Sequence, residues 1–307
     1  MSSQNIQTWS TGAPWLNAHC KLGEGPYYEA GTNTLRFVDI IKKQLHTVSL
    51  ADGPDSLETL AFEECVTVTA DIEGVDPREK ILVGAKQGIA VLDRKSGKYE
   101  YIARFPDAGV KNERIRGNDG VVDPHGRFWL GTMTDFPYGK PTDEGSLFVF
   151  ASNKQDATLI KPNLTIPNSI GFSPDRKTLY FTHTTSSQVL AWDYDPASGA
   201  VSNERVFYQH SGPGSPDGFR VDTEGNVWHA IYGGACVLKI SPEGKVVGKV
   251  ELPTRNATCP EFVGTELFIT TASDDEGEGE SKEYGGGLFR VDVGARGHEV
   301  FKFKLGA

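Results

Sequence analysis

The chain has 307 residues, of which 38% are hydrophobic and 23% are charged, a balance typical of a folded globular protein and not of a disordered one. Its formal net charge of −10 argues against nucleic acid and anionic membranes as partners, because both attract clustered Lys and Arg. No apolar run approaches the roughly 20 residues that a membrane-spanning helix needs. We therefore expect neither nucleic acid nor a membrane as a partner.

The N-terminal stretch and the cysteines indicate the compartment. Residues 1–15 have neither the basic segment nor the apolar segment of a secretory signal. The cysteines are widely spaced and form no Cys-x-x-Cys pair, which argues against a zinc finger and a thioredoxin-type motif. Scattered single cysteines are typical of reduced, buried thiols, so we expect a cytoplasmic protein. The four cysteines are Cys20, Cys65, Cys236 and Cys259.

Short β-branched and aromatic runs dominate the chain from its N-terminal part onward. Glycine, with 35 residues, supplies many turns between these runs. No long segment has the 3.6-residue period of a helix, and the strands do not alternate with helices, so the pattern predicts an all-β protein. In chain order, the clearest expected strands are 37–40, 81–85, 128–132, 179–183, 227–231 and 267–271.

These strands recur at a regular interval. Each follows an acidic or Pro/Gly-rich turn, and their first apolar residues lie 40 to 51 residues apart. Six units of this length, with room for about four strands each, indicate a six-bladed β-propeller of four-stranded antiparallel blades around a central channel. The six first apolar residues, here called the anchors, are Leu35, Ile81, Phe128, Leu179, Val227 and Leu267.

The propeller is expected to be one domain that spans residues 1–307. A closed ring leaves no unpaired sheet edge, so an N-terminal segment should complete the last blade. The candidates are Ile6–Trp9 and Ala18–Leu22, which would pair with the last strands, expected at 286–293 and 300–305.

Oxygen-bearing side chains lie at a shared distance before four of the anchors. The first strand of each blade should line the channel, so equivalent positions in different blades converge on the axis. Taken singly, these are turn residues, but their common register supports a shared site. Counting back 10 or 11 residues gives Glu24, Asn118, Asn168 and Asp217, and in the second and sixth blades Ala70–Asp71 and Asn256–Ala257.

Two carboxylates and two amides on one axis form an all-oxygen site. Such ligands suit a hard divalent ion, Ca²⁺ first, with Mg²⁺ or Mn²⁺ as alternatives. The four positions contain no His or Cys, which argues against tight zinc binding, although Zn²⁺ and Fe²⁺ stay open as further alternatives.

Five stretches contain most of these turn and channel residues. They are LGEGP (22–26) with RFVDI (36–40), RGNDGVVDPHGRFWLGTM (116–133), PNSIGFSPDRKTLYFT (167–182), PDGFRVDTEGNVWHAIYGG (216–234) and GGGLFRV (285–291). Together they resemble the SMP-30/gluconolactonase family, which includes regucalcin and sugar lactonases. The resemblance runs from about residue 19 to residue 293.

The resemblance implies a six-bladed propeller with one catalytic divalent ion and, as in many members, hydrolysis of sugar lactones. It implies that Glu24, Asn168 and Asp217 are metal ligands. It places Asn118 beside the metal or the substrate, and it implies that Arg116 contacts substrate oxygens.

Two positions depart from the family pattern. Tyr27 and Tyr28 stand where members often have Trp, and Phe136 stands where some have a substrate-binding Glu. The neighbouring Asp135 is then the expected substitute in substrate binding.

The expected function is therefore a metal-dependent lactonase that opens aldonolactones, such as glucono-, galactono-, arabinono- or xylonolactone, to aldonic acids. The ion polarises the lactone carbonyl. Asp217 either acts as the base on the attacking water or only orients a hydroxide on the metal, and the sequence leaves both open. A phosphotriesterase or other esterase on the same metal site, and a non-enzymatic calcium-binding regulatory propeller, stay open as other functions. We expect a monomer or a weak homodimer.

The acidic run DDEGEGESKE (274–283) lies between expected strands of the sixth blade. It lacks the Asp-x-Asp-x-Asp-Gly spacing of an EF-hand. We expect a solvated loop at the rim of the propeller, because runs of like charge extend into water.

Overall fold

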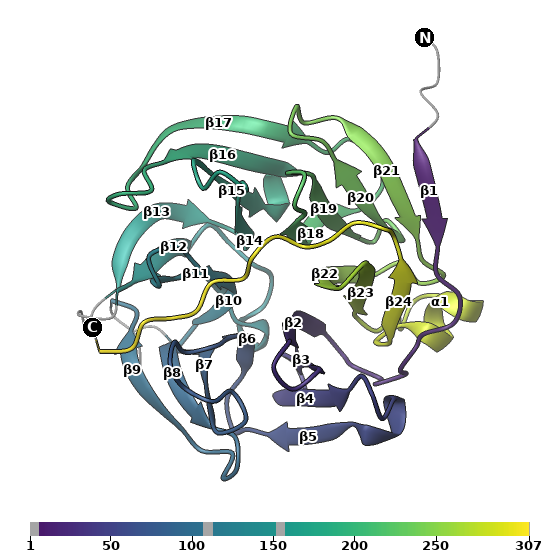
Figure 1. Cartoon of the computed structure of the whole chain (residues 1–307), viewed down its shortest axis with the longest axis horizontal. Coiled ribbons are helices and arrows are strands. Elements are labelled where there is room, and N and C mark those ends of the chain that lie inside the picture. Colours follow the sequence, from purple (N-terminus) through teal and green to yellow (C-terminus); the bar gives the residue numbers. More distant parts are fainter. Residues whose placement is uncertain (1–5, 107–112, 152–156, 307) are drawn as a thin grey trace.

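The computed structural model describes residues 6–106, 113–151 and 157–306. Its strands form six small sheets arranged in a ring (Figure 1). This confirms the predicted all-β, six-bladed propeller. Within each blade the consecutive strands are antiparallel neighbours, and the first of them is innermost, while the N-terminal strand is added to the edge of one sheet in parallel.

The first three blades each contain four strands. The first blade consists of β2 (Gly23–Glu29), β3 (Thr34–Asp39), β4 (Gln44–Ser49) and β5 (Glu58–Ala61), with the 3-10 turn η1 (Pro54–Ser56) before β5. The second consists of β6 (Val66–Ala70), β7 (Lys80–Ala85), β8 (Gly88–Asp93) and β9 (Tyr99–Arg104). The third consists of β10 (Ile115–Val122), β11 (Phe128–Thr134), β12 (Gly145–Phe150) and β13 (Thr158–Leu164), with η2 (Phe136–Tyr138) after β11.

The fourth and fifth blades again contain four consecutive strands, and the sixth contains three. The fourth consists of β14 (Pro167–Phe172), β15 (Thr178–His183), β16 (Gln188–Tyr194) and β17 (Val201–Gln209), with η3 (Thr184–Ser186) after β15. The fifth consists of β18 (Ser215–Val221), β19 (Val227–Tyr232), β20 (Cys236–Ile240) and β21 (Val246–Glu251). The sixth consists of β22 (Ala257–Val263), β23 (Glu266–Thr271) and β24 (Leu288–Asp292), with helix α1 (Gly279–Tyr284) inside the acidic run.

The six anchors all lie at the start of the second strand of their blade. Each has no exposed surface, so the repeat predicted from the sequence is a repeat of buried positions. The turn before the anchor is stabilised in the same way in two blades. Asp123 accepts a hydrogen bond from Trp129 Nε1 at 2.9 Å, and Asp222 accepts one from Trp228 Nε1 at 2.9 Å. A buried carboxylate thus connects each tight turn to the strand that follows it.

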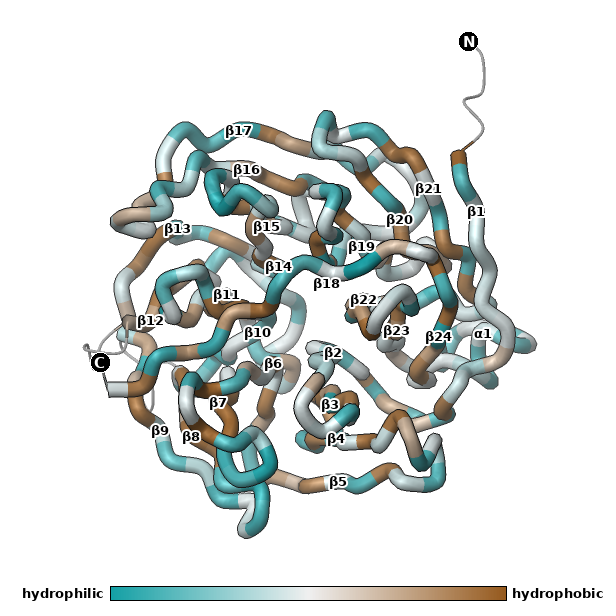
Figure 2. The backbone as a smooth tube through the Cα atoms, viewed as in Figure 1, coloured by the Kyte–Doolittle hydropathy of each residue, from teal (hydrophilic) through white to brown (hydrophobic). Residues whose placement is uncertain are grey.

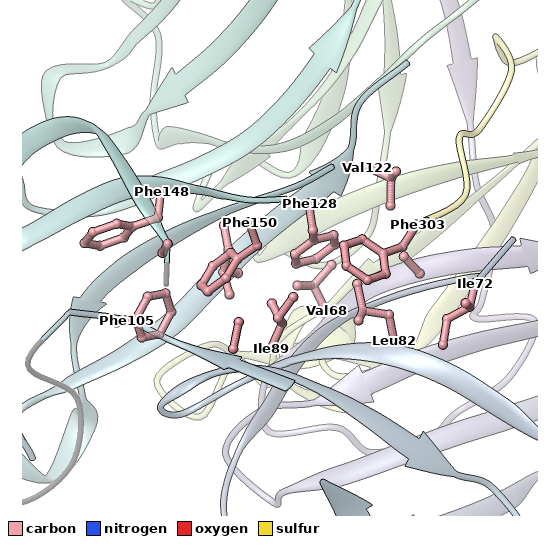
Figure 3. Packing of buried hydrophobic residues seen from close by; sticks show 14 residues of the cluster. Val68, Ile72, Leu82, Ile89, Phe105, Val122, Phe128, Phe148, Phe150 and Phe303 are labelled. Carbon is pink, nitrogen blue, oxygen red and sulfur yellow. The ribbon is translucent and has the colours of Figure 1, made fainter. Parts of the chain in front are cut away.

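Apolar side chains from neighbouring blades pack between the sheets. Figure 2 shows brown hydrophobic segments along the strands and teal hydrophilic residues in many connecting turns. Figure 3 shows one such cluster, in which Val68 and Leu82 of the second blade meet Phe128 and Phe150 of the third, together with Phe303 near the C-terminus. The four cysteines are buried and free, as expected from their spacing.

Of the two N-terminal segments expected at the sixth blade, the first lies elsewhere. Strand β1 (Gln7–Ser10) pairs in parallel with β21 of the fifth blade, where the ring of Trp9 packs on Trp228 with centroids 5.2 Å apart. The sixth blade receives two isolated bridges, one from Leu22 to Ala272 and one from Leu16, whose N–H and C=O both bond to Leu288, at 3.1 and 2.8 Å. Cys20 N also donates to Gly286 O at 2.9 Å, so the second candidate segment, 18–22, does contact the sixth blade. Residues 6–9 therefore extend the fifth blade and not the sixth.

The expected last strand at 300–305 is also placed differently. After β24 the chain crosses one end of the ring, visible as the yellow segment in Figure 1. Gly297 bridges to Asp222 of the fifth blade, and Lys304 N bonds to Gly126 O of the third at 3.0 Å. Phe303 pairs with Ile72, which lies between β6 and β7 of the second blade. This C-terminal segment covers the end of the channel where the innermost strands finish. Among the described residues, we find no helix with the length and apolar character needed to cross a membrane.

Candidate active site

All six innermost strands share one irregularity. In five of them the pairing with the second strand slips at the equivalent residue, and in β2 it slips directly after that residue, because Glu24 still pairs with Val38; a β-bulge of this kind re-aims the side chains beside it. The slip lies near the start of the strand, at the channel end opposite the C-terminal segment. The residues at this position, in blade order, are Glu24, Thr67, Asn118, Asn168, Asp217 and Thr258.

The pairing registers confirm the common register of four predicted residues and correct the other two blades. Thr67 and Thr258 hold the position for which the count from the anchors gave Ala70–Asp71 and Asn256–Ala257. The count fails because the connection before the second strand spans residues 71–79 in the second blade but only residues 264–265 in the sixth. Both threonine hydroxyls are used internally, since Thr258 Oγ1 donates to Gly23 O at 2.6 Å and Thr67 Oγ1 to Gly84 O at 3.4 Å.

Three buried carboxyl groups lie close together in the ring. Burial raises the pKa of Glu24 well above its ordinary value, and the nearby charges of Asp217 and Asp119 raise it further. Burial also raises the pKa of Asp217, again with Asp119 adding to the effect. Like charges that raise one another's pKa in a desolvated place favour a bound cation or a proton. This part of the molecule therefore has the electrostatics of a cation site.

Asn168 connects this acidic group to the fourth blade. Its Nδ2 donates a hydrogen bond to Asp217 Oδ1 and a longer one, 3.3 Å, to Thr184 Oγ1 of η3. Its Oδ1 is buried and has no hydrogen-bond partner among the residues that the structure describes. A buried amide oxygen without a donor, beside two carboxylates, fits a hard cation that takes oxygen ligands.

No group of three or more His, Cys, Asp and Glu side chains with metal-binding geometry occurs within the described ranges. The candidate metal set therefore depends on an amide in addition to its two carboxylates. Glu24, Asn168 and Asp217 are the residues whose free oxygens and charge fit an ion.

Asn118 is engaged more fully than the other three predicted ligands. Its Nδ2 donates to Pro167 O at 2.9 Å, and its Oδ1 accepts from Arg116 Nη1 at 2.9 Å. Arg116 has only 1% of its surface exposed, its Nη1 also donates to Gly117 O at 2.7 Å, and its Nε is buried without a partner. Asn118 therefore holds the guanidinium of Arg116 next to the site.

The residues after β11 cover the other side of this guanidinium. The ring of Phe136 lies over it, with its centroid 4.5 Å from Cζ of Arg116, and is 45% exposed. Asp135 Oδ1 lies 3.7 Å from Arg116 Nε and accepts a hydrogen bond from Phe136 N at 2.9 Å. The structure thus brings Arg116, Asn118 and Asp135 together, as predicted, and adds Phe136 as an aromatic cover.

Sequence reasoning missed two supporting side chains. Lys86, in the turn between β7 and β8, forms an ion pair with Asp135 Oδ2, and nothing in its local sequence marks it. Ser169 donates its hydroxyl to Asp119 Oδ2 at 2.6 Å and accepts from Phe219 N at 2.9 Å. Ser169 directly follows Asn168, so the shared register could have drawn attention to it. These contacts fix the orientation of the Asp119 carboxylate beside the site.

Comparison with known protein families identifies the family to which the chain belongs. The family described as the SMP-30/gluconolactonase/LRE-like region matches residues 22–273, which is most of the chain. The protein therefore belongs to the SMP-30/gluconolactonase family, in agreement with the resemblance seen in its motifs.

Individual relatives match along almost the whole chain. A pentonolactonase, XacC of Haloferax volcanii, is 32% identical over 299 residues, which cover 94% of this chain and 96% of the relative. A putative sugar lactone lactonase of Rhizobium meliloti is 30% identical over 304 residues, covering 96% and 98%. Among solved structures, a calcium-binding protein, regucalcin, from Agrobacterium tumefaciens matches with a TM-score of 0.87 at 26% identity, covering 97% of this chain and 99% of the other.

Proposed function

We propose that this protein is a metal-dependent hydrolase that opens sugar lactones to aldonic acids. The observation that carries the proposal is the buried group of Glu24, Asn168 and Asp217, in which two interacting carboxyl groups accompany an amide oxygen without a donor among the described residues. The names of two relatives that match along almost the whole chain, a pentonolactonase and a putative sugar lactone lactonase, support the choice of substrate class.

Glu24, Asn168 and Asp217 would hold the ion, and Asn118 Oδ1 keeps a second lone pair beside them. The all-oxygen set favours Ca²⁺, with Mg²⁺, Mn²⁺, Zn²⁺ or Fe²⁺ as alternatives. The calcium-binding regucalcin among the similar structures supports the same choice. A bound divalent ion supplies a Lewis acid that polarises the lactone carbonyl.

Asp217 is the candidate base. In the hydrolysis, Asp217 accepts a proton from the attacking water, and the water oxygen bonds to the carbonyl carbon. The bond between this carbon and the ring oxygen then breaks, and the ring oxygen takes the proton to become a hydroxyl group of the aldonic acid. Asn168 donates to Asp217 Oδ1 and so fixes the orientation of the carboxylate during proton transfer.

Arg116 and Asp135 are the candidate substrate-binding pair, with Asn118 as the residue that positions Arg116. The planar guanidinium donates hydrogen bonds to substrate oxygens, and its buried Nε makes no hydrogen bond to the described residues, its ion-pair partner Asp135 being 3.7 Å away. Asp135 accepts from sugar hydroxyl groups, while Lys86 and Phe136 N fix its orientation. Together these residues would hold the lactone ring on the third-blade side of the site.

The test is pH-stat hydrolysis of a panel of sugar lactones after EDTA treatment, and then with each divalent ion restored, with spontaneous hydrolysis subtracted. We expect turnover that disappears with EDTA and returns with one ion. An absence of turnover on every lactone, with the ion still bound, would overturn the proposal. Organophosphate esters assayed in parallel would then test the phosphotriesterase function, and bound ion without any turnover would indicate a calcium-binding regulator.

A further inference from the structure

A cleft of ≈390 Å³ lies beside the candidate active site, over the sixth blade. Tyr232, Arg255 and Asn256 line it on one side, and Asp274 and Glu276, at the start of the acidic run, line it on the other. None of these residues takes part in the catalysis proposed above. The cleft is a separate volume whose walls are polar side chains.

The strand pairing places the cleft between the two carboxylates of the site. Tyr232 pairs with Ser215 on the strand of Asp217, and it also bridges to Asn256 at the start of the sixth blade. On the far side of that blade, Ser273, which also lines the cleft, donates its N–H to Lys21 O at 3.2 Å, just before the strand of Glu24. The cleft therefore spans the gap between the strands of Asp217 and Glu24.

The sixth blade, beside this gap, contributes no free side-chain oxygen at the bulge. The sixth-blade residue at the bulge is Thr258, and its hydroxyl donates to Gly23 O inside the protein. In a ring of six blades the sixth lies opposite the third, which carries Arg116 and Asp135. A lactone ring held by Arg116 at the centre therefore extends its far end toward the cleft.

The polar groups in the cleft suit hydroxyl groups. Asn256 is 9% exposed, and its Nδ2 donates to Ser273 O at 2.9 Å. Neither Asn256 Oδ1 nor the hydroxyl of Tyr232 has a hydrogen-bond partner among the residues described, and Tyr232 is 40% exposed. An acceptor in a largely buried side chain and an adjacent phenol form a donor–acceptor pair that a sugar hydroxyl satisfies.

The charges of the cleft disfavour an anion. Asp274 binds the guanidinium of Arg255, with Nε to Oδ2 at 2.8 Å, so this cation is already neutralised. Asp275 forms an ion pair with Lys21, and Glu276 is exposed and has no ion pair in the described part of the chain. The carboxylates thus outnumber the free cations, and a phosphate or sulfonate group would be repelled.

We propose that this cleft binds the hydroxylated exocyclic chain of the lactone, and that its acidic side excludes lactones whose chain carries an anion. The inference rests on the proposed lactonase function and deepens it by naming the part of the substrate that sets selectivity. The chemical class is thus a neutral aldonolactone with a hydroxyl-bearing side chain.

The first experiment reverses the charge. kcat/KM is measured for gluconolactone and for its 6-phosphate in the metal-loaded wild type, in Glu276→Lys, and in the matched control Glu283→Lys, which is exposed on α1 and outside the cleft. We expect Glu276→Lys to raise the ratio of phosphorylated to neutral substrate by about tenfold. The control should leave this ratio within about twofold of the wild type.

The second experiment removes one hydroxyl. Gluconolactone and xylonolactone share their ring stereochemistry and differ by the exocyclic carbon with its hydroxyl. We expect Tyr232→Phe to lower kcat/KM for gluconolactone about 2- to 10-fold, the loss of one hydrogen bond, and to leave xylonolactone nearly unchanged.

The outcomes separate the two proposals. A wild type that hydrolyses neither lactone contradicts the lactonase function itself. The cleft assignment is overturned, and the function is left intact, if the wild type hydrolyses both lactones and the variants give two results. The ratio of kcat/KM for phosphorylated to neutral gluconolactone is equal in Glu276→Lys and Glu283→Lys, and Tyr232→Phe lowers kcat/KM equally for gluconolactone and xylonolactone.

Discussion

Nδ2 of Asn168 donates a hydrogen bond to Oδ1 of Asp217, from the fourth blade to the fifth. This bond decides which way the amide faces, because the second donor contact, to Thr184, uses the same nitrogen. Oδ1 of Asn168 is therefore left without a donor in a buried position. One hydrogen bond thus orients both the candidate base and the neutral oxygen ligand of the site.

Asp217→Asn keeps the shape of the side chain and removes its charge. If Asp217 is the base, kcat for lactone hydrolysis should fall by about 10²–10⁴-fold, the usual contribution of a general base. The measurement is the pH-stat assay at saturating divalent ion, with ion binding followed by calorimetry. Asp55→Asn, at an exposed site in η1, is the matched control. Turnover near the wild-type rate in Asp217→Asn would contradict the assignment.

Replacement of Asn168 by Leu removes the unpartnered oxygen at similar volume. We expect the divalent ion to bind at least tenfold more weakly, because one ligand and the orientation of Asp217 are lost together. Metal-loaded wild type should also melt at a higher temperature than EDTA-treated wild type, because the ion binds only the folded state. Calorimetric titration and thermal melts measure both effects. Unchanged ion affinity in Asn168→Leu would exclude this amide as a ligand.

Arg116→Lys tests the planar guanidinium. Lysine keeps the charge but cannot donate to Gly117 O and Asn118 Oδ1 while it also reaches a substrate oxygen. We expect kcat/KM to fall about 10- to 100-fold, since a hydrogen bond to a charged group contributes about 1.5–3 kcal/mol. The loss should appear mainly in KM. A fall confined to kcat, with KM unchanged, would show that Arg116 does not bind the ground-state substrate.

Glu29→Gln tests the buried ion pairs beneath the first two blades. Arg36 has no exposed surface and donates to Glu29, which also pairs with Arg94. Because the substitution leaves Arg36 buried with less countercharge, we expect a loss of about 3–5 kcal/mol in the free energy of unfolding at pH 7. Denaturant unfolding of the wild type, Glu29→Gln and the exposed control Glu100→Gln measures this loss.

The same pair gives a pH dependence with a definite sign. Burial acts to raise the pKa of Glu29, but the charges of Arg36 and then Arg94 outweigh it and hold the pKa below its ordinary value of 4.5. The stabilisation from this lowered pKa is complete above the pKa of the unfolded chain and is lost as the pH falls through the folded-state pKa. The gap in stability between the wild type and Glu29→Gln should therefore be constant above about pH 5 and shrink below pH 4.5. A gap that is constant down to pH 3 would contradict this pairing.

The sequence predicted the parts of the fold that repeat locally. A turn followed by a fully buried anchor recurs in every blade, and within four blades a fixed count leads from the anchor to Glu24, Asn118, Asn168 or Asp217. The count missed Thr67 and Thr258 because connection length is free to vary between strands while the sheet register is not. Backbone pairing, which the sequence does not display, is what defines the equivalent positions.

The sequence did not predict the contacts between segments that lie far apart in the chain. Lys86 of the second blade forms an ion pair with Asp135 of the third, and Trp9 packs on Trp228 of the fifth blade. Both depend on how neighbouring sheets are placed in the ring. The position of β1 shows this most clearly, because an edge strand can pair with any sheet edge that comes within reach, and its own residues do not specify which.

The bulge near the start of each innermost strand has a consequence for how such a molecule can change. The backbone of every innermost strand is irregular at or directly after this position, yet the side chains there differ in chemistry from blade to blade. The ring thus contains six equivalent positions, occupied here by two acids, two amides and two threonines. A substitution at one of these positions changes the chemistry at the axis and leaves the buried anchors of the blades unchanged. Some of these residues also join neighbouring blades, since Asn118 donates to Pro167 O and Thr258 donates to Gly23 O, so positions that face the axis also help to hold the ring closed.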